Sequence, residues 1–367
     1  MKKLLFLIHD LDQGGAEKVL VNLVNNMDAA KFNITVIVLF GGGVNEQFLA
    51  PYIRLIVCHK KAFRGNSHVM KLFSPRQLYR HYIKEHYDIV ISYLEGPSAR
   101  IISGCDDPSI KKISWIHCTM HSANDISKGF RSFSEARRSY VKMDRLVFVS
   151  SGVREKFLMN CPYTGQTEVL YNTNESENIL QKSKDESAIL PECFNWCGIG
   201  KVSENKGFDR MIRIQSRLIH EGYNVHLHIL GDGPLKPELE ELAVSEGVSG
   251  TVSFHGYQTN PYKYISRSDL FVCASHSEGF STAATEALIV GTPVVTTLVS
   301  GMKEMLGEND EWGVITENNE DALYEGIKGL LDDPAMLAHY KEKAIERGKS
   351  FSTEATVKAV EDMLLSL

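Results

Sequence analysis

Short apolar runs alternate with longer amphipathic segments along most of the chain, and this alternation constrains the fold more than any other feature. A short buried run fits a β-strand, whereas apolar residues that recur every three to four positions fit a helix. Strands that alternate with helices form a parallel sheet with helices on both faces, so the sequence predicts an α/β fold. The predicted strands are residues 4–8, 34–40, 88–92, 112–117 and 145–149 in one series, and 195–200, 225–230, 251–254, 270–274 and 293–296 in a second.

Two such series predict two domains, and the length of 367 residues exceeds the usual size of one domain. Residues 172–190 are polar and show no clear period, so they are the predicted connection between the domains. We place the first domain at residues 1–172 and the second at residues 191–350. The final residues, 351–367, are predicted to include an amphipathic helix that needs a surface to cover.

The composition is that of an ordinary globular protein, with 43% hydrophobic and 23% charged residues. The formal net charge of −6 argues against a nucleic-acid partner held by bulk positive charge. No apolar run approaches the roughly 18 to 20 residues that span a bilayer. Residues 4–8 are predicted to be a strand and not part of a signal peptide, because polar residues follow at once. Seven cysteines, an odd number, do not suggest a disulfide framework, so the predicted location is the cytoplasm.

The richest group of polar residues follows the fourth strand of the second series. Gly279 allows a ligand to approach the backbone closely. Ser281 and Thr282 stand where a helix is predicted to begin, so that N–H groups there can receive a phosphate or a sugar oxygen. Glu278 precedes this helix and Glu286 lies about a turn and a half inside it, and both can accept hydrogen bonds from sugar hydroxyls. The alternative is that Glu278 caps the helix and Glu286 faces solvent.

This segment resembles the signature of the family 4 glycosyltransferases, which are retaining enzymes with the GT-B fold. In that signature two glutamates eight positions apart flank a Gly-aromatic turn, and a Gly-x-Pro-Val stretch opens the next strand. Here the glutamates are Glu278 and Glu286, the turn is Gly279-Phe280, and residues 291–294 open the strand. The match is long and therefore specific.

A second resemblance lies in residues 200–207, which look like the family's Gly-Arg-Leu…Lys-Gly loop. Two cations at the end of a strand can neutralise a nucleotide diphosphate without a metal ion. Lys206 falls at the family's lysine. Lys201 replaces the usual arginine, which keeps the charge but loses the bidentate guanidinium group. A solvated surface loop is the alternative interpretation.

Three shorter matches complete the predicted site. Gly14-Gly15 resembles the family's N-terminal Gly-Gly-Ala-Glu segment, where bare backbone at a helix start meets the diphosphate or the transferring sugar. His117 stands where family members commonly have a histidine near that sugar, and it is predicted to donate to a sugar hydroxyl or to stabilise charge in the transition state. Gly256-Tyr257 resembles the turn whose backbone meets the nucleotide base.

The resemblance implies two Rossmann-like domains that face each other across a cleft, with residues 351–367 returning to the first domain. The implied reaction transfers a hexose or N-acetylhexosamine, with retention, from a nucleotide diphosphate sugar, with UDP preferred to GDP. The implied acceptor is a glycan or a lipid-linked acceptor in capsule, exopolysaccharide or other surface glycan synthesis. Neither a metal nor another cofactor is expected. Glu278 would hold the sugar hydroxyls and Glu286 the ribose.

The resemblance is strongest over residues 200–295 and weakest over residues 44–80. In the first domain, residues 128–145 interleave basic and aromatic side chains, which suggests a peripheral contact with the cytoplasmic membrane leaflet; an ordinary solvated helix is the alternative.

Three other functions are considered. A nucleotide-sugar 2-epimerase can share the same fold. A dinucleotide-dependent oxidoreductase would need a G-x-G-x-x-G sequence, which is missing after the first strand. A non-catalytic nucleotide-sugar-binding protein is excluded only by observing turnover.

Overall fold

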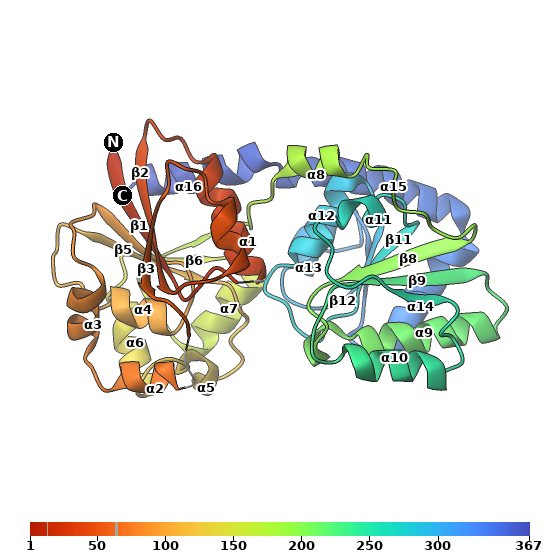
Figure 1. Cartoon of the computed structure of the whole chain (residues 1–367), viewed down its shortest axis with the longest axis horizontal. Coiled ribbons are helices and arrows are strands. Elements are labelled where there is room, and N and C mark those ends of the chain that lie inside the picture. The colour runs from red at the N-terminus through yellow and green to blue at the C-terminus, as the bar shows by residue number, and fades with distance from the viewer. Residues whose placement is uncertain (13, 63–64) are drawn as a thin grey trace. The chain divides into compact units, whose positions relative to one another are not determined.

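The chain divides into two compact units. The first unit contains Met1–Asn174 together with Thr353–Leu367, and the second contains Glu175–Ser352. Each unit has its own parallel sheet with helices on both sides (Figure 1), which confirms the predicted α/β fold with two Rossmann-like units. The computed structural model describes residues 1–12, 14–62 and 65–367.

The sheet of the first unit has seven parallel strands in the order β3-β2-β1-β4-β5-β6-β7. Its strand β1 pairs with β2 and β4, so that Leu4 aligns with both Ile34 and Ile89. Residues 4–8 are fully buried, which explains why they form an unbroken apolar run and do not alternate with polar residues. The strands are β1 (Lys2–Ile8), β2 (Phe32–Phe40), β3 (Arg54–His59), β4 (Ile89–Ser92), β5 (Lys111–Ile116), β6 (Arg145–Phe148) and β7 (Gln166–Val169).

The C-terminal helix α16 belongs to the first unit, where it packs against α1. The amino group of Lys2 donates to the Leu364 carbonyl oxygen at 3.0 Å, and Lys31 forms an ion pair with Glu361 at 3.0 Å. Helices α4 and α6 contact each other and lie on the other side of the sheet (Figure 1). The helices are α1 (Gly15–Asn26), α2 (Asn66–Lys71), α3 (Pro75–Tyr82), α4 (Pro97–Ile102), α5 (Ala123–Ile126), α6 (Phe133–Val141), α7 (Ser151–Asn160) and α16 (Thr353–Leu365), with a 3-10 turn η1 (Val44–Phe48).

The sheet of the second unit has six parallel strands in the order β10-β9-β8-β11-β12-β13. Counted along the chain within the unit, this is the order 3-2-1-4-5-6 of dinucleotide-binding folds, and the first six strands of the first unit have the same order. The strands are β8 (Phe194–Ile199), β9 (Val225–Leu230), β10 (Val252–Phe254), β11 (Leu270–Cys273), β12 (Val294–Thr297) and β13 (Val314–Thr316).

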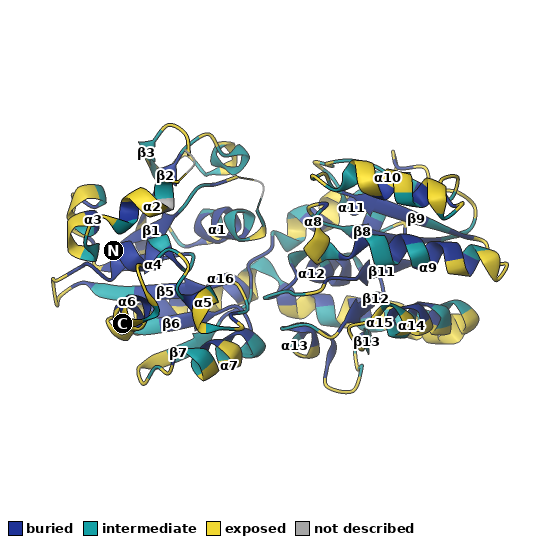
Figure 2. Cartoon of the chain, turned by 90° about the horizontal axis from the view of Figure 1, so that it is seen from below, coloured by how far each residue is buried: buried dark blue, intermediate teal, exposed yellow. Residues whose placement is uncertain are grey.

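Helices cover both faces of this second sheet, with α9, α10 and α14 on one side and α8, α11 and α12 on the other (Figure 1). Buried residues line the strands and the inner faces of the helices, whereas the exposed residues lie on the outer faces (Figure 2). The helices are α8 (Ser176–Lys182), α9 (Phe208–His220), α10 (Lys236–Ser245), α11 (Tyr262–Ile265), α12 (Thr282–Val290), α13 (Met302–Leu306), α14 (Glu320–Asp332) and α15 (Pro334–Gly348), with 3-10 turns η2 (Glu204–Lys206) and η3 (Lys349–Phe351).

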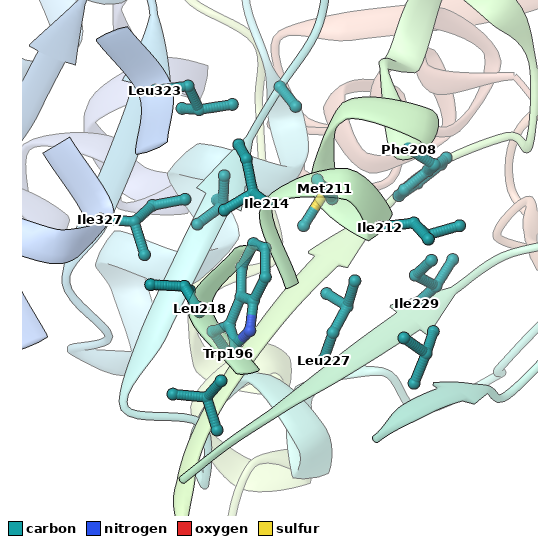
Figure 3. Close-up of a cluster of buried hydrophobic side chains, with 14 of the residues drawn as sticks. Trp196, Phe208, Met211, Ile212, Ile214, Leu218, Leu227, Ile229, Leu323 and Ile327 are labelled. Atoms are coloured by element: carbon teal, nitrogen blue, oxygen red, sulfur yellow. The ribbon is translucent and has the colours of Figure 1, made fainter. Parts of the chain in front are cut away.

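The core between β8 and α9 is built around Trp196 (Figure 3). Its ring packs among aliphatic side chains that include Leu218 of α9 and Ile327 of α14. Its indole N–H donates to the Gln215 Oε1 atom at 2.8 Å, so the polar atom of this buried ring is satisfied. This packing fixes the position of strand β8, and with it the start of the loop that follows its carboxyl end.

Each of the ten predicted strands is present, and β3, β7 and β13 were not predicted. These three are edge strands with half-exposed residues, and they lack the continuous apolar run that marked the others. The segment 172–190 contains α8, which contacts α11 and α12 of the second unit. Within the described ranges, no helix combines the length and the apolar character that crossing a bilayer requires.

Candidate functional site

The loops after β8 and β11 leave the sheet of the second unit at its topological switch point. Strand β8 lies between β9 and β11, and the strand order reverses direction there. Connections that depart to opposite sides leave a crevice at the carboxyl ends of the two strands, where open α/β sheets bind their ligands. Lys206 follows β8 and Glu278 follows β11, so the predicted cation and the predicted carboxylate come from the two loops that form this crevice.

Lys206 and Glu278 form an ion pair, with 2.6 Å between Nζ and Oε1. The lysine side chain is 26% exposed and that of the glutamate is 12% exposed. The Ser275 hydroxyl also donates to Oε1 of Glu278, at 2.6 Å. Burial opposes the charge on Lys206, but the neighbouring Glu278 carboxylate outweighs it and the pKa of the lysine is raised. The ammonium group is therefore charged at neutral pH.

Hydrogen bonds join the two loops directly. The Asn205 side-chain amide donates to the Ser277 carbonyl oxygen at 2.8 Å, and the His276 N–H donates to the Asn205 carbonyl oxygen at 2.8 Å. Gly207 has a left-handed backbone, with φ +65°, and a Cβ there would overlap the Ala274 carbonyl oxygen. A glycine is needed at this position so that α9 can begin against the β11 loop. These contacts between the two loops fix the positions of Lys206 and Glu278.

Lys201 and the Gly256-Tyr257 turn lie at other strand ends of the same unit. The Lys201 side chain is exposed, one residue after Gly200. The Gly256 carbonyl oxygen accepts the Gly231 N–H at 2.8 Å, which ties the turn after β10 to the end of β9. Gly256 has φ +63°, and the side chain of Tyr257 is exposed.

Helix α12 begins as predicted, and its N-cap residue and the burial of Glu286 rule out the alternative roles for the two glutamates. Ser281 is the N-cap residue, with its hydroxyl accepting the Ala284 N–H at 3.3 Å, and Thr282 is the first helical residue. Glu278 is therefore not the cap. Glu286 is buried and does not face solvent, and its Oε1 atom accepts the hydroxyl of Tyr262 at 3.1 Å. A carboxylate in such a place needs a binding partner or a structural role.

The Gly279-Phe280 turn sits between these two glutamates in sequence. Phe280 is buried, and its ring lies 5.9 Å from that of Phe351, centroid to centroid. The Gly279 carbonyl oxygen lies close to Gly301, where an added Cβ would crowd it. The aromatic residue of the turn therefore anchors the loop.

In the first unit, Gly14 and Gly15 open helix α1 after β1. The place of a Cβ on Gly14 is taken by the carboxylate of Glu17, so an acidic group lies over this glycine. Burial raises the pKa of Glu17, and the nearby Asp10 and Asp12 raise it further. The turn therefore presents an acidic surface and not only bare backbone, which suits hydroxyl groups better than a diphosphate.

His117 follows β5 in the same unit and is buried. Its backbone N–H donates to Glu95 at 3.1 Å, and its ring packs on Tyr93 with 4.8 Å between centroids. Burial lowers the pKa of His117 to about 3, although a hydrogen bond to the Tyr93 backbone opposes this. The ring is therefore neutral at physiological pH. The Nε2 atom is buried and has no hydrogen-bond partner among the described residues, and the predicted contact of His117 with a sugar hydroxyl stays a prediction.

Sequence reasoning missed several residues that hold the predicted ones. Ser275 and Tyr262 bond to the two glutamates, and Asn205 joins their loops. In the first unit, Glu95 accepts the backbone N–H of His117, and the carboxylate of Glu17 lies over Gly14. Ser275 and Glu95 lie just beyond the ends of β11 and β4, which is a usable signal. Tyr262, in a short helix, carries no such signal.

Residues 128–145, where the sequence predicts a leaflet contact, contain three aromatic side chains, of which Phe133 is half-exposed. Phe130 and Tyr140 are buried, with their ring centroids 5.6 Å apart. Tyr140 packs inward because α6 lies against α4. The exposed face of this segment carries Arg137 and Arg138 together with Val141, which is 60% exposed, so the leaflet contact stays a prediction beside the ordinary solvated helix.

Comparison with known proteins agrees with this arrangement. Residues 192–347 match the family model described as glycosyl transferases group 1, and residues 13–173 match the model described as Glycosyltransferase Family 4. The solved structure of Anabaena Alr3699/HepE, in complex with UDP and glucose, superposes with a TM-score of 0.79 at 17% identity, covering 100% of both chains. WaaG, a glycosyltransferase involved in lipopolysaccharide biosynthesis, superposes with a TM-score of 0.74 at 17% identity, over 98% of this chain and 99% of that one.

Two relatives known from sequence are bacterial glycosyltransferases. The N-acetylgalactosamine-N,N'-diacetylbacillosaminyl-diphospho-undecaprenol 4-alpha-N-acetylgalactosaminyltransferase of Campylobacter jejuni subsp. jejuni is 28% identical over 368 residues, which is 96% of each chain. The capsular polysaccharide biosynthesis glycosyltransferase CapM of Staphylococcus aureus is 26% identical over 172 residues, covering 45% of this chain and 44% of that protein.

The two sheets with their strand-end loops define the class: this is a glycosyltransferase of the GT-B fold. Within that class, the chain belongs to the group 1, family 4 glycosyltransferases. Family membership favours sugar transfer over the 2-epimerase and the oxidoreductase that the sequence left as alternatives.

Proposed function

We propose that this enzyme transfers a hexose or N-acetylhexosamine, with retention, from a nucleotide diphosphate sugar to a glycan or lipid-linked acceptor. UDP is the proposed nucleotide, ahead of GDP, and the product is a capsule, exopolysaccharide or other surface glycan. The observation that carries the proposal is the Lys206–Glu278 ion pair at the switch point of the second sheet. The complex of the Anabaena structure with UDP and glucose supports the choice of donor, and the undecaprenol-linked substrate in the name of the Campylobacter relative supports the choice of acceptor.

Donor binding exchanges the partners of this ion pair. The diphosphate forms an ion pair with the ammonium group of Lys206. The Glu278 carboxylate then no longer pairs with the lysine, and it accepts hydrogen bonds from the hydroxyls of the transferring sugar. The two opposite charges lie together at one crevice. They complement a sugar nucleotide, which carries negative charge on its diphosphate and hydroxyl hydrogen-bond donors on its sugar. Lys201 and the N-terminal turn of α12, including Thr282, add positive potential near the diphosphate. These groups supply the neutralisation for which some transferases use a metal ion.

The nucleoside is proposed to lie along the neighbouring strand ends. Glu286 accepts the ribose hydroxyls, and the hydroxyl of Tyr262 donates to its Oε1 atom and orients the carboxylate. The backbone of the turn at Gly256-Tyr257 meets the base. Burial of Glu286 favours a ligand with two neighbouring hydroxyls, because such a ligand can donate hydrogen bonds to a carboxylate that is shielded from water.

In the first unit, His117 is proposed to accept a hydroxyl of the transferring sugar at Nε2. This atom is buried and without a hydrogen-bond partner in the described residues, and a ligand hydroxyl would satisfy it. The acidic turn at Gly14-Gly15 is proposed to meet hydroxyl groups of the sugar or the acceptor. In retaining transfer of this kind a donor phosphate oxygen takes the proton of the acceptor hydroxyl, so no protein base is assigned.

A thermal-shift screen of the purified chain against UDP, GDP, ADP and their common sugar conjugates tests the donor site. Selective stabilisation by UDP and by one UDP-sugar, unaffected by EDTA, is the expected result. A response only after a divalent cation is added would contradict the proposed metal independence. Stabilisation by a sugar nucleotide that is turned over to its 2-epimer without an acceptor would replace transfer with epimerisation, and binding without any turnover would favour a non-catalytic protein.

A further inference from the structure

Three histidines of the second unit lie side by side on neighbouring strands. His226 and His228 belong to β9, and His255 directly follows β10. The ring centroids of His226 and His228 are 4.7 Å apart, and those of His228 and His255 are 5.2 Å apart. We call these three residues the histidine row. Its last member immediately precedes the Gly256-Tyr257 turn, which is proposed to meet the nucleotide base.

The histidine row is joined to strand β8 by a hydrogen bond whose direction can be assigned. The side-chain amide nitrogen of Asn195 donates to the carbonyl oxygens of Pro191 and Cys193, at 2.9 and 2.7 Å. Carbonyl oxygens only accept, so the amide oxygen of Asn195 is the atom that faces His228, whose Nε2 lies 2.9 Å from it. His228 therefore carries a proton on Nε2 and donates it to this oxygen.

The direction of this bond determines the next one. Burial lowers the pKa of His228 to about 3, and the neighbouring His226 and His255 contribute. The ring is therefore neutral, and its Nδ1 atom is an acceptor. His255 has its Nε2 atom 3.0 Å from this Nδ1, so His255 is the donor. Because His228 is only 2% exposed, removing this donor would leave a buried acceptor without its partner.

His255 also contacts both parts of the proposed nucleoside site. Its carbonyl oxygen accepts the side-chain amide of Gln258 at 2.7 Å, which closes the turn between the two residues. Its ring packs on Tyr264 of α11, with 4.4 Å between centroids. In the same helix, Tyr262 donates to the Glu286 carboxylate. One imidazole thus touches the turn for the base and the helix that orients the carboxylate for the ribose.

We propose that His255 is a positioning residue for the nucleoside of the donor. Its ring, held by the hydrogen bond to His228, fixes the place of the Gly256-Tyr257 turn and of α11. Helix α11 has only four residues, and so short a helix is held mainly by its side-chain contacts. The proposal rests on the proposed function and deepens it, since it separates the residue that positions the nucleoside from Lys206, which binds the diphosphate.

Binding of two probes to the full chain tests this separation. UMP contains the nucleoside, whereas inorganic pyrophosphate contains only the diphosphate. His255→Phe keeps a ring against Tyr264 but removes the donor to His228, and it should weaken UMP binding about 3- to 10-fold. Binding of pyrophosphate should stay within about twofold of the wild type. His255→Gln places an amide nitrogen as many bonds from Cα as Nε2 of histidine, so it should retain more of the UMP affinity than His255→Phe.

His226→Gln is the matched control. His226 belongs to the same histidine row and bonds to Ser253 at 2.8 Å, but it lies near the start of β9 and not at its carboxyl end. This variant should bind both probes like the wild type. Tyr264→Leu is a milder variant, because Tyr264 is half-buried. It should weaken UMP binding about 2- to 5-fold, which keeps the proposal testable if His255→Phe does not fold.

Three outcomes would overturn the proposal. A folded His255→Phe variant could bind UMP like the wild type, UMP and pyrophosphate could weaken by the same factor, or His226→Gln could lose as much UMP affinity as His255→Phe. Circular dichroism and urea unfolding of each variant identify misfolding. A wild-type chain that binds no nucleotide would instead remove the proposed donor, so failure of the proposed function is distinguishable from failure of the role of His255.

Discussion

Replacing Lys206 by methionine tests the central contact of the donor site. The change keeps the length of the side chain and removes the charge that pairs with Glu278 at 2.6 Å. A hydrogen bond to a charged group contributes about 1.5–3 kcal/mol, which corresponds to about 10- to 150-fold in affinity for UDP. The carboxylate left behind also repels the diphosphate, so the upper part of that range is expected.

The same substitution affects stability through a different mechanism. Glu278 is only 12% exposed and loses its cation, but the Ser275 hydroxyl still donates to it. Breaking a fully buried pair costs about 3–5 kcal/mol. Because Lys206 is 26% exposed and water can enter, we expect a loss of about 1–3 kcal/mol in the free energy of unfolding.

The double variant Lys206→Met/Glu278→Gln separates the two effects. Removing both charges should restore most of the lost stability, because no buried carboxylate is left unpaired. Its affinity for UDP should recover only in part, since the repulsion is gone but the cation is still missing. Isothermal titration with UDP and urea unfolding measure the two quantities. Wild-type affinity in Lys206→Met, or in the double variant, would refute the assignment of this lysine to the diphosphate.

Three further changes test other parts of the structure. Tyr262→Phe removes the hydroxyl that holds Glu286, and should raise the KM for the donor about 3- to 10-fold with little change in kcat; a fall in kcat alone would argue against a ribose role. Burial lowers the pKa of His117 to about 3 from an ordinary value of 6.5, so its contribution to stability is complete above about pH 6.5 and is lost as the pH falls towards 3. His117→Gln should therefore flatten the fall of the urea midpoint between about pH 7 and pH 5, and an unchanged slope would contradict this. Gly207→Ala places a Cβ against a backbone carbonyl oxygen at φ +65°, so it should lower the free energy of unfolding by about 2–4 kcal/mol. Gly222→Ala is the control, because Gly222 has φ +90° but open space around it. It should lower the free energy of unfolding by only about 1–2 kcal/mol.

The fold was largely predictable because its central strands are buried on both faces. Residues such as those of β1 form continuous apolar runs, and the intervening helices show their own period. The strands that sequence reasoning missed, β3, β7 and β13, lie at sheet edges, where one side meets solvent and polar residues break the run. A similar limit applies to the segment 128–145. Sequence alone did not reveal that Phe130 and Tyr140 turn inward.

The candidate site was predictable as a set of positions but not as a set of contacts. Glu278 and Lys206 lie in the loops that follow β11 and β8, and parallel strands bring their carboxyl ends to one edge of a sheet. Their ion pair depends on loop conformations that Asn205 and Gly207 set through backbone contacts, and such contacts leave no periodic signal. The protonation of His117 likewise depends on burial, which a lone histidine in the sequence does not reveal.

Anomeric analysis of the transfer product tests the central claim most directly. The purified chain would be incubated with the UDP-sugar that stabilises it and with a lipid-linked or glycan acceptor, and the coupling constant of the anomeric proton would be followed by NMR from the first minutes. The proposed function predicts release of UDP together with a product whose anomeric configuration matches that of the donor, and loss of both in Glu278→Ala. An inverted product, or transfer that survives in a folded Glu278→Ala variant, would contradict it.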